Sequence, residues 1–256
     1  MRHLITCALN GLDLLALDDR IYIEDILEEI EIDHETGKRA AYGLFPLNEP
    51  RHQNITLTVK VMVKERRRPE RMSVIQDIRA WAGRGWLTTN IRPNQRLYVF
   101  CVQPPNAETF DWTGRMEIVF RAYGESYWQD VRPRTASSET AVTSANVTLS
   151  PTGTRPCFLE AEITPSGDML TTARITVNGD RFFQLNGLEI GAGETLAMYY
   201  DELHLLHIEC DGASLLGSRT AESADHLTLT PKQPNTIALS FNTACDYTIK
   251  ARGMWR

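Results

Sequence analysis

The sequence lacks the features that would place the protein in a membrane, in a secretion pathway or on nucleic acid. Its 256 residues include no apolar stretch of membrane-spanning length, and "MRHLITCALNGLDLL" at the start has no long apolar core and no small-residue cleavage site. Acidic residues outnumber basic ones by 33 to 27, whereas nucleic-acid binders carry a clustered cationic footprint. We therefore expect a protein that stays in the cytoplasm in which it is made, with no membrane insertion and no nucleic-acid partner.

Recognisable catalytic and metal-binding signatures are also missing. "DELHLLHIEC" (201–210) spaces its polar ligand types by three, which alternates between faces on a strand and drifts half-way round a helix. "GASLLG" (212–217) is one residue too long for a nucleophile elbow, and "GAGE" (191–194) is too short for a phosphate loop. We expect no enzyme, no catalytic residue, no cofactor and no metal site. The histidines of this stretch are expected to be satisfied or exposed.

Neither the cysteines nor the one basic run indicates a function. The five cysteines are odd in number and widely spaced, which favours reduced core thiols over a disulfide framework. The run "KERRRPER" (64–71) lies between an alternating segment and a helical one. A solvated connection is the simpler interpretation of this run, and a phosphate or partner contact is the alternative.

What the sequence does have is a hydrophobic period of two along most of the chain. In "NITLTVKVMV" (54–63) the apolar and the polar residues alternate, as a half-buried antiparallel strand requires. Residues 3–9, 21–26, 96–102 and 115–123 are further strand candidates. One helix is predicted in "PERMSVIQDIRAWAG" (69–83), where a proline leads and a glycine ends a run of helical spacing. The first half is therefore predicted to be α+β.

A change in composition divides the chain. "RPRTASSETAVTS" (132–144) has small and hydroxylated residues and few large apolar ones, which is typical of a linker. After it come short strands punctuated by turn residues every 8 to 12 positions or so, the spacing of an antiparallel sandwich. We predict a first domain over 1–135, a linker over 136–144 and an all-β domain over 145–256.

One segment of the first domain is long for a connection and poor in regular pattern. "EIDHETGKRAAYGLFPLNEPRHQN" (31–54) is mostly polar, and such loops are usually functional or ordered by a partner. A flexible surface loop with no role in assembly is the alternative. Four apolar side chains lie close together in it and are the candidate interface residues: Tyr42, Leu44, Phe45 and Leu47.

The order of the pieces resembles the distal tail proteins of long-tailed bacteriophages. An α+β half leads through an aromatic exit to a Gly-Thr-x-Pro turn, a β-rich half, a late turn and a closing aromatic-basic pair. In this chain these motifs are Tyr127 with Trp128, Gly153 with Thr154 and Pro156, Pro231 to Ile237, and Trp255 with Arg256. The resemblance spans essentially the whole chain, and it depends on the order of the motifs because each one alone is short.

This resemblance implies a mainly β fold, in which a ring-forming α+β domain with a protruding hairpin (about 31–54) precedes a galectin-like antiparallel β-sandwich. It implies a structural subunit of a phage tail tip or baseplate in the virion, assembling with itself into a ring, as a hexamer. The ring joins the tail tube protein to the tail-tip hub or tail-associated protein and serves as an assembly platform, and receptor-binding proteins are further partners that the family allows.

Two departures from the family pattern bear on these expectations. Many relatives have an Asp-Pro pair before the aromatic exit, where this chain has Gly124, Glu125 and Ser126, and the chain has no room for the inserted carbohydrate-binding modules of larger members. A carbohydrate-binding module for host adsorption stays open as the alternative function. However, the second half has its only tryptophan at Trp255 and lacks the His-Asn-Arg cluster with which galectins hold sugar.

Overall fold

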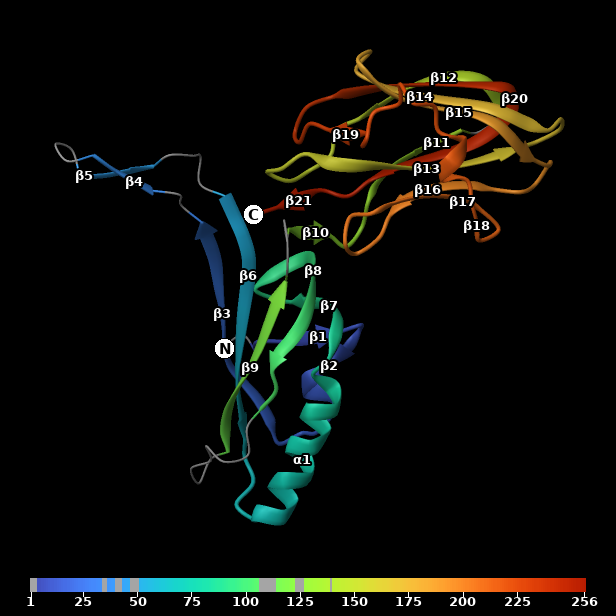
Figure 1. Cartoon of the computed structure of the whole chain (residues 1–256). Coiled ribbons are helices and arrows are strands. Elements are labelled where there is room, and N and C mark those ends of the chain that lie inside the picture. Colours follow the sequence, from blue (N-terminus) through green and yellow to red (C-terminus); the bar gives the residue numbers. More distant parts are fainter. Residues whose placement is uncertain are drawn as a thin grey trace. The chain divides into compact units, whose positions relative to one another are not determined.

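The structure, a computed structural model, describes residues 4–33, 36–39, 43–46, 51–105, 114–122, 127–138 and 140–256. The chain divides into two compact units, Met1–Trp128 and Gln129–Arg256. Both are built mainly from antiparallel strands, which confirms the mainly β fold (Figure 1). No helix in the described ranges is long and apolar enough to cross a membrane.

The first unit is a curled antiparallel sheet with one long helix against it. Its elements are β1 (Cys7–Leu9), β2 (Leu12–Asp13), the 3-10 helix η1 (Leu14–Ala16), β3 (Ile21–Asp33), β4 (Thr36–Arg39), β5 (Gly43–Pro46), β6 (Arg51–Val63), α1 (Arg68–Trp81), β7 (Arg84–Thr89), β8 (Arg92–Gln103) and β9 (Arg115–Ala122). The sheet order is β2-β1-β7-β8-β9-β6-β3. The predicted strands and the predicted helix of this half are all present.

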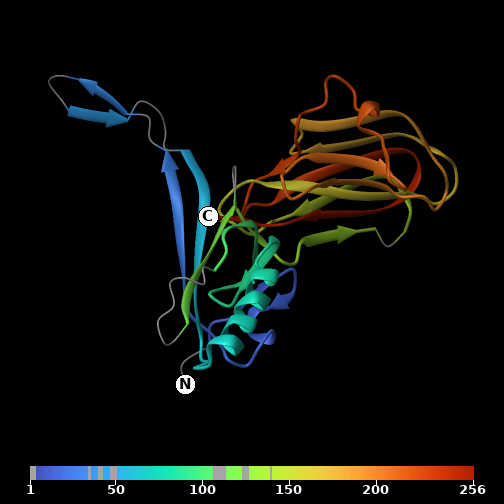
Figure 2. The ribbon, with the colours of Figure 1, turned by 60° about the horizontal axis from the view of Figure 1, so that its bottom comes forward.

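The core of this unit is built from apolar residues that recur at every second position of β6 and at helical spacing in α1. Every second residue of β6 from Ile55 to Val63 is at most 1% exposed, because alternate side chains of a strand share a face. Helix α1 covers that face (Figure 2) with Val74, Ile75, Ile78 and Trp81. The Trp81 ring meets Phe120 edge-on at 5.9 Å between centroids, so helix and sheet interlock through aromatic packing.

The second unit consists almost entirely of strands. They are β10 (Trp128–Asp130), whose first residue closes the first unit, then β11 (Arg134–Ser137), β12 (Val142–Leu149), β13 (Cys157–Pro165), β14 (Leu170–Val177), β15 (Arg181–Ile190), β16 (Leu196–Tyr200), β17 (Leu206–Cys210), β18 (Ala213–Ser214), the 3-10 helix η3 (Leu216–Ser218), β19 (Thr228–Leu229), β20 (Asn235–Ala251) and β21 (Met254–Trp255). Their order is β15-β14-β20-β13-β16-β17-β18, with β11 and β12 also on β20 and β19 on β13.

Strand β20 connects the layers of this unit. Its first half, from residue 235 to 241, pairs with β12 and β14, and its second half, from 245 to 251, pairs with β13 and β11. Buried Asn235 holds the start of the strand, since its side-chain amide donates to the carbonyl oxygens of Leu149, Thr230 and Gln233. One 17-residue strand therefore ties both halves of the unit together.

The segment 136–144, predicted as a linker, lies mostly within strands. Residues 134–137 pair with 248–251 of β20, and β12 begins at Val142. Between them the Ser138 amide donates to the Tyr247 carbonyl, and the Tyr247 amide to the Ser138 hydroxyl. Composition misses this arrangement because backbone hydrogen bonds require no apolar side chains. The division of the chain comes at Trp128, ahead of the predicted 135.

We predict that a fragment 129–256 is more stable than a fragment 139–256. The shorter piece loses β11, whose hydrogen bonds cover the end of β20, and β10, which pairs with β21. At roughly 1 kcal/mol for each net hydrogen bond, the loss is a few kcal/mol. Urea denaturation followed by circular dichroism measures the difference, and equal midpoints for the two fragments would contradict the pairing.

The glycine of the Gly-Thr-x-Pro turn is required by the backbone. Gly153 has φ +107°, and a Cβ built there would lie 2.4 Å from the Met254 carbonyl oxygen. That oxygen also accepts hydrogen bonds from the Thr154 and Arg155 amides. The turn is therefore locked against β21 with no room for a side chain.

Gly153→Ala should destabilise the second unit by about 3 kcal/mol, combining left-handed backbone strain with a steric clash. Gly179→Ala is the matched control, because Gly179 has φ +80° but nothing within 4 Å of its Cβ position. Thermal unfolding of both variants tests this, and equal losses would show that the close approach to Met254 carries no cost.

Candidate assembly interface

One end of the first unit's sheet is the outer edge of β3. This strand ends the sheet order, and β6 is its neighbour in the described sheet. Backbone groups that point away from β6 have no strand partner in the described part of the chain. Such an edge is a template for pairing with another chain unless the protein modifies it.

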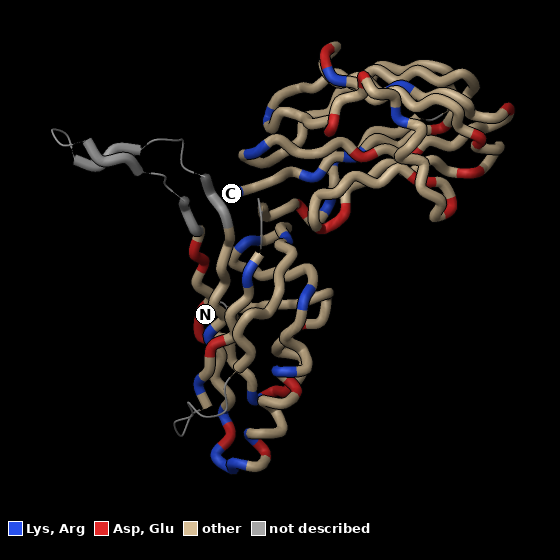
Figure 3. The backbone as a smooth tube through the Cα atoms, in the orientation of Figure 1, with Lys and Arg blue, Asp and Glu red and all other residues tan. Residues whose placement is uncertain are grey.

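The β3 edge carries two of the known modifications. Its sequence, IYIEDILEEIEID, has no lysine or arginine and six acidic residues: Glu24, Asp25, Glu28, Glu29, Glu31 and Asp33. The pairing register with β6 shifts twice, between Ile23 and Asp25 and between Ile30 and Ile32. Figure 3 shows acidic positions along β3 up to the part of the strand that is drawn in grey. Charges and bulges both prevent unselective pairing, so this edge is suited to a selective partner.

On its inner face β3 is anchored to the exit of the unit. Arg92 donates to both carboxylate oxygens of Glu28, at 2.8 and 2.9 Å, and the Trp128 indole N–H donates to Glu28 Oε1 at 3.1 Å. The Arg92 guanidinium also lies 5.2 Å from the centroid of the Trp128 ring. A half-buried bidentate pair of this kind is geometrically specific. It holds the predicted aromatic exit residue Trp128 in place.

Beyond β9, the β3–β6 ladder continues as a two-stranded arm. The last described pair with β9 is Ile55 with Ala122, whereas β3 and β6 pair as far as Asp33 with Arg51. Past that point β4 and β5 pair with each other in a separate two-stranded sheet. The segment expected to lack regular pattern is therefore largely strand, because long-range pairing supplies order that its composition does not suggest.

The four candidate interface residues fall on this hairpin or next to it. Leu44 and Phe45 lie in β5, opposite Lys38 and Gly37. Tyr42 and Leu47 lie outside the described residues. The contacts of these four side chains therefore stay a prediction, while the hairpin that carries two of them is part of the structure.

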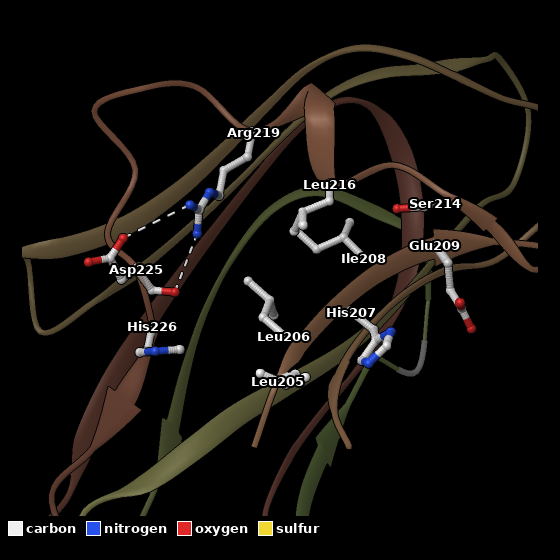
Figure 4. A pocket seen from close by; sticks show the side chains of 10 residues that line it. All are labelled: Leu205, Leu206, His207, Ile208, Glu209, Ser214, Leu216, Arg219, Asp225 and His226. Atoms are coloured by element: carbon white, nitrogen blue, oxygen red, sulfur yellow. Dashed lines mark hydrogen bonds and ion pairs between the residues drawn. The ribbon is translucent and has the colours of Figure 1, made fainter. Parts of the chain in front are cut away.

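The second unit has an open pocket of about 680 Å³ beside β17 (Figure 4). Arg219 spans one side of it, with its guanidinium 4.0 Å from the Asp225 carboxylate. Three leucines on or near the rim are unusually exposed, Leu203 at 63%, Leu205 at 59% and Leu216 at 44%. The residues that line the pocket are Leu205, Leu206, His207, Ile208, Glu209, Ser214, Leu216, Arg219, Asp225 and His226.

The polar residues next to this pocket mainly build a turn. Asp201 Oδ1 accepts hydrogen bonds from the amides of Leu203 and Leu205, and its Oδ2 lies 3.3 Å from His207 Nε2. Burial acts to raise the pKa of Asp201, but the Leu205 amide, His207 and the Leu203 amide together hold that pKa below its usual value. The His207 ring stacks on Tyr199. Within the described ranges no hydrogen bond joins His207 to Ser214, so the two do not form a nucleophile and base pair.

The cysteine thiols are poorly suited to nucleophilic catalysis. All five cysteines are free, and burial raises the pKa of Cys7 and of Cys157 to about 12. Thiols of such high pKa are poor nucleophiles at neutral pH. Among the residues that the structure describes, no group of three or more histidine, cysteine or acidic side chains is placed to hold a metal ion.

The depressed pKa of Asp201 predicts an acid-dependent stability. A carboxyl group whose pKa is lower in the folded state stabilises the fold above its unfolded pKa, near 4, and that contribution is lost as pH falls through the folded value. Asp201→Asn should therefore lower the urea midpoint at pH 7 and flatten its fall between pH 5 and pH 3. Asp211→Asn, in the turn after β17, is the control. If the urea midpoint of Asp201→Asn fell with pH as steeply as that of the parent, the role given to the Asp201 carboxylate would be contradicted.

Comparison with known proteins places this geometry in a structural context. No family model matches the sequence, and no curated protein matches it. Among solved structures, the SPP1 Dit protein (gp 19.1), described as a paradigm of the hub adsorption apparatus in phages infecting Gram-positive bacteria, aligns with a TM-score of 0.66 and 14% identity over 97% of this chain and 98% of that one.

Two chains from the phage P2 baseplate in its activated conformation also align over nearly their full length. The form with calcium has a TM-score of 0.56 and 8% identity over 99% of this chain and 98% of that one. The form with strontium has a TM-score of 0.55 and 8% identity over 97% of each chain. The chain therefore has a Dit-like fold along its whole length, which confirms at the level of fold the resemblance found in the sequence.

Proposed function

We propose that this protein is a structural, non-enzymatic subunit of a phage tail tip or baseplate. It forms a closed ring, six-fold, that joins the tail tube protein to the tail-tip hub or tail-associated protein and serves as a platform for assembly. The observation that carries the proposal is the Dit-like fold of the whole chain. On this proposal the protein is made in the cytoplasm of the host and resides in the virion.

The free edge of β3 supports a ring on physical grounds. An edge strand that is acidic and bulged, yet holds half-exposed Ile26 and Ile30 and exposed Leu27, is suited to cover by a neighbouring copy. In a ring, every subunit meets its neighbours through the same unlike pair of surfaces. A contact of this kind needs to bury more than about 1,000 Å² to persist.

The hairpin β4–β5 is proposed to grip the next subunit. The cluster of Tyr42, Leu44, Phe45 and Leu47 is the part of the hairpin expected to be covered there. At roughly 25 cal/mol for each Å² of apolar area, four such side chains contribute several kcal/mol to each contact before the cost of ordering them.

In the second unit, the exposed leucines around the pocket support a role as a platform. Leu205 and Leu216 line the pocket and are exposed, and exposed Leu203 lies two residues from Leu205. An apolar surface patch is suited to a protein contact. Receptor-binding proteins are the partners proposed for it.

A carbohydrate-binding module is the second candidate function. The polar side chains of the pocket, which include His207, Glu209 and Arg219, favour it, since sugars are held by convergent polar groups. No tryptophan lines the pocket to stack on a sugar ring. A glycan array with the full chain tests this candidate, and specific binding that Arg219→Ala abolishes would establish it.

The ring is tested by light scattering over a concentration series, with electron microscopy of the particles. We expect the intact chain to form rings. Deleting residues 36–48 should raise the concentration needed for assembly by about 100-fold, because a loss of 2 to 3 kcal/mol at each contact corresponds to that factor.

Leu203→Ser/Leu205→Ser is the matched control for the deletion, since it removes exposed apolar side chains from the second unit and leaves the hairpin intact. This variant should assemble like the parent. A parent that stays monomeric at every concentration, with or without tail tube and hub proteins, overturns the ring. A deletion variant that assembles like the parent leaves the ring standing but removes the hairpin from the contact.

A further inference from the structure

The open face of the first unit's sheet changes charge from one side to the other. This is the face that α1 does not cover, and it includes the polar side of β6 (Figure 2). Directly opposed residues of an antiparallel sheet share a face, so the pairing register traces rows across it. One row begins with an arginine and ends with a glutamate: Arg84 of β7, Phe100 of β8, Arg121 of β9, Thr56 of β6 and Glu29 of β3.

The charges of the individual strands agree with this polarity. Strand β3 has six acidic residues and no basic one, and β7 and β8 together have three arginines and no acidic residue, although Glu28 and Arg92 already pair with each other within the unit. Two acidic residues of β3, Asp25 and Glu29, lie on the open face opposite Lys60 and Thr56. The two sides of the same sheet are therefore electrostatic complements of each other.

The basic side of the face also carries a ladder of half-exposed aromatic rings. The Arg96 guanidinium lies 3.8 Å over the Trp86 ring, Trp86 meets Tyr98 at 5.3 Å, and Tyr98 meets Phe100 at 5.6 Å between centroids. Exposed Arg84 begins the same strand as Trp86. Aromatic and arginine side chains are the residues most enriched at the centres of protein interfaces. We call Arg84, Trp86, Arg96 and Tyr98 the arginine-aromatic strip.

We propose that the acidic edge of β3 in one copy of this chain packs against the arginine-aromatic strip of the next copy. The inference rests on the proposed ring and names the surfaces that close it. Asp25 and Glu29 face arginines across the contact, and exposed Leu27 lies between them against the aromatic rings. The same unlike contact repeats at every subunit boundary.

The charge pattern disfavours contacts between like surfaces. Two β3 edges meeting each other would bring Asp25 and Glu29 of one copy close to those of the other, and like charges directly opposed are destabilising. Two strips would bring arginines together in the same way. The attractive pairing joins an edge to a strip, and in the proposed ring this pairing repeats head to tail.

At the strip itself the contact is made by side chains and does not add a strand. The Asn10 side chain already satisfies the backbone there, because its Nδ2 donates to the Arg84 carbonyl at 3.2 Å and its Oδ1 accepts from the Trp86 amide at 3.0 Å. The interaction should therefore weaken with salt, as contacts between exposed charges do.

The experiment is a charge exchange in the full chain. An edge variant, Asp25→Lys/Glu29→Lys, and a strip variant, Arg84→Glu/Arg96→Glu, should each need an about 100-fold higher concentration to assemble, because like charges then meet at every contact. Mixed in equal amounts, the two should form rings with alternating subunits, which an even-numbered ring allows. All four changes in one chain should restore assembly without a partner.

Arg66→Glu/Arg68→Glu is the matched control, since it makes the same change of charge at two exposed arginines, one just before α1 and one at its first residue. It should assemble like the parent. Circular dichroism checks that each variant is folded. The change Arg96→Glu also removes the stacking of Arg96 on Trp86. Two single variants, Arg84→Glu and Glu29→Lys, therefore repeat the charge exchange without changing Arg96.

The outcomes separate this inference from the ring. A parent that never assembles overturns the proposed function. A parent that assembles, with edge and strip variants that assemble equally well, overturns the inference and leaves the ring. The inference is also wrong if the combined variant stays monomeric while folded, or if the control turn variant loses assembly as the strip variant does.

Discussion

An antiparallel sheet cannot end without leaving a row of backbone donors and acceptors unpaired, and in the first unit that row lies along β3. A 13-residue strand is long for an edge, and it is an aggregation hazard when it is flat and apolar. Here acidic side chains and two register shifts restrict what can pair with it. In the proposed ring the neighbour packs its side chains against this edge strand and shields it from pairing with other chains.

Interactions within each unit hold its surfaces in a fixed conformation before a partner binds. Glu28 fixes β3 to Arg92 of β8 and to Trp128, so the inner face of the edge strand is tied to a strand that is not its neighbour in the sheet. In the second unit, β20 does the same work by pairing with strands of both layers. A partner therefore meets surfaces that are already in place, and association costs less ordering.

How much of this was predictable depends on which residues carry the signal. Strand β6 and helix α1 were readable because one face of each is buried, so Ile55 to Val63 and Val74 to Trp81 show their periods in the sequence. Strand β11 was not, since its pairing with β20 is a backbone interaction and residues 134–137 are small or exposed. Residues 31–54 show no regular pattern either, and the hairpin of β4 with β5 was expected only from the family resemblance. Which strand forms the edge, and how the charges line up across the sheet, depends on strand order, which the sequence does not encode locally.

The two contacts proposed for the ring arise from a single structural element. Strands β3 and β6 form one continuous ladder from Ile21 with Val63 to Asp33 with Arg51, and the β4–β5 hairpin follows directly. Surface ion pairs are worth about 1 kcal/mol or less each, so the charged edge alone would make a weak interface. A second contact from the same ladder is made at high effective concentration once the first has formed. The weak charge contacts can then determine the orientation of the neighbour, while the apolar side chains of the hairpin contribute most of the affinity.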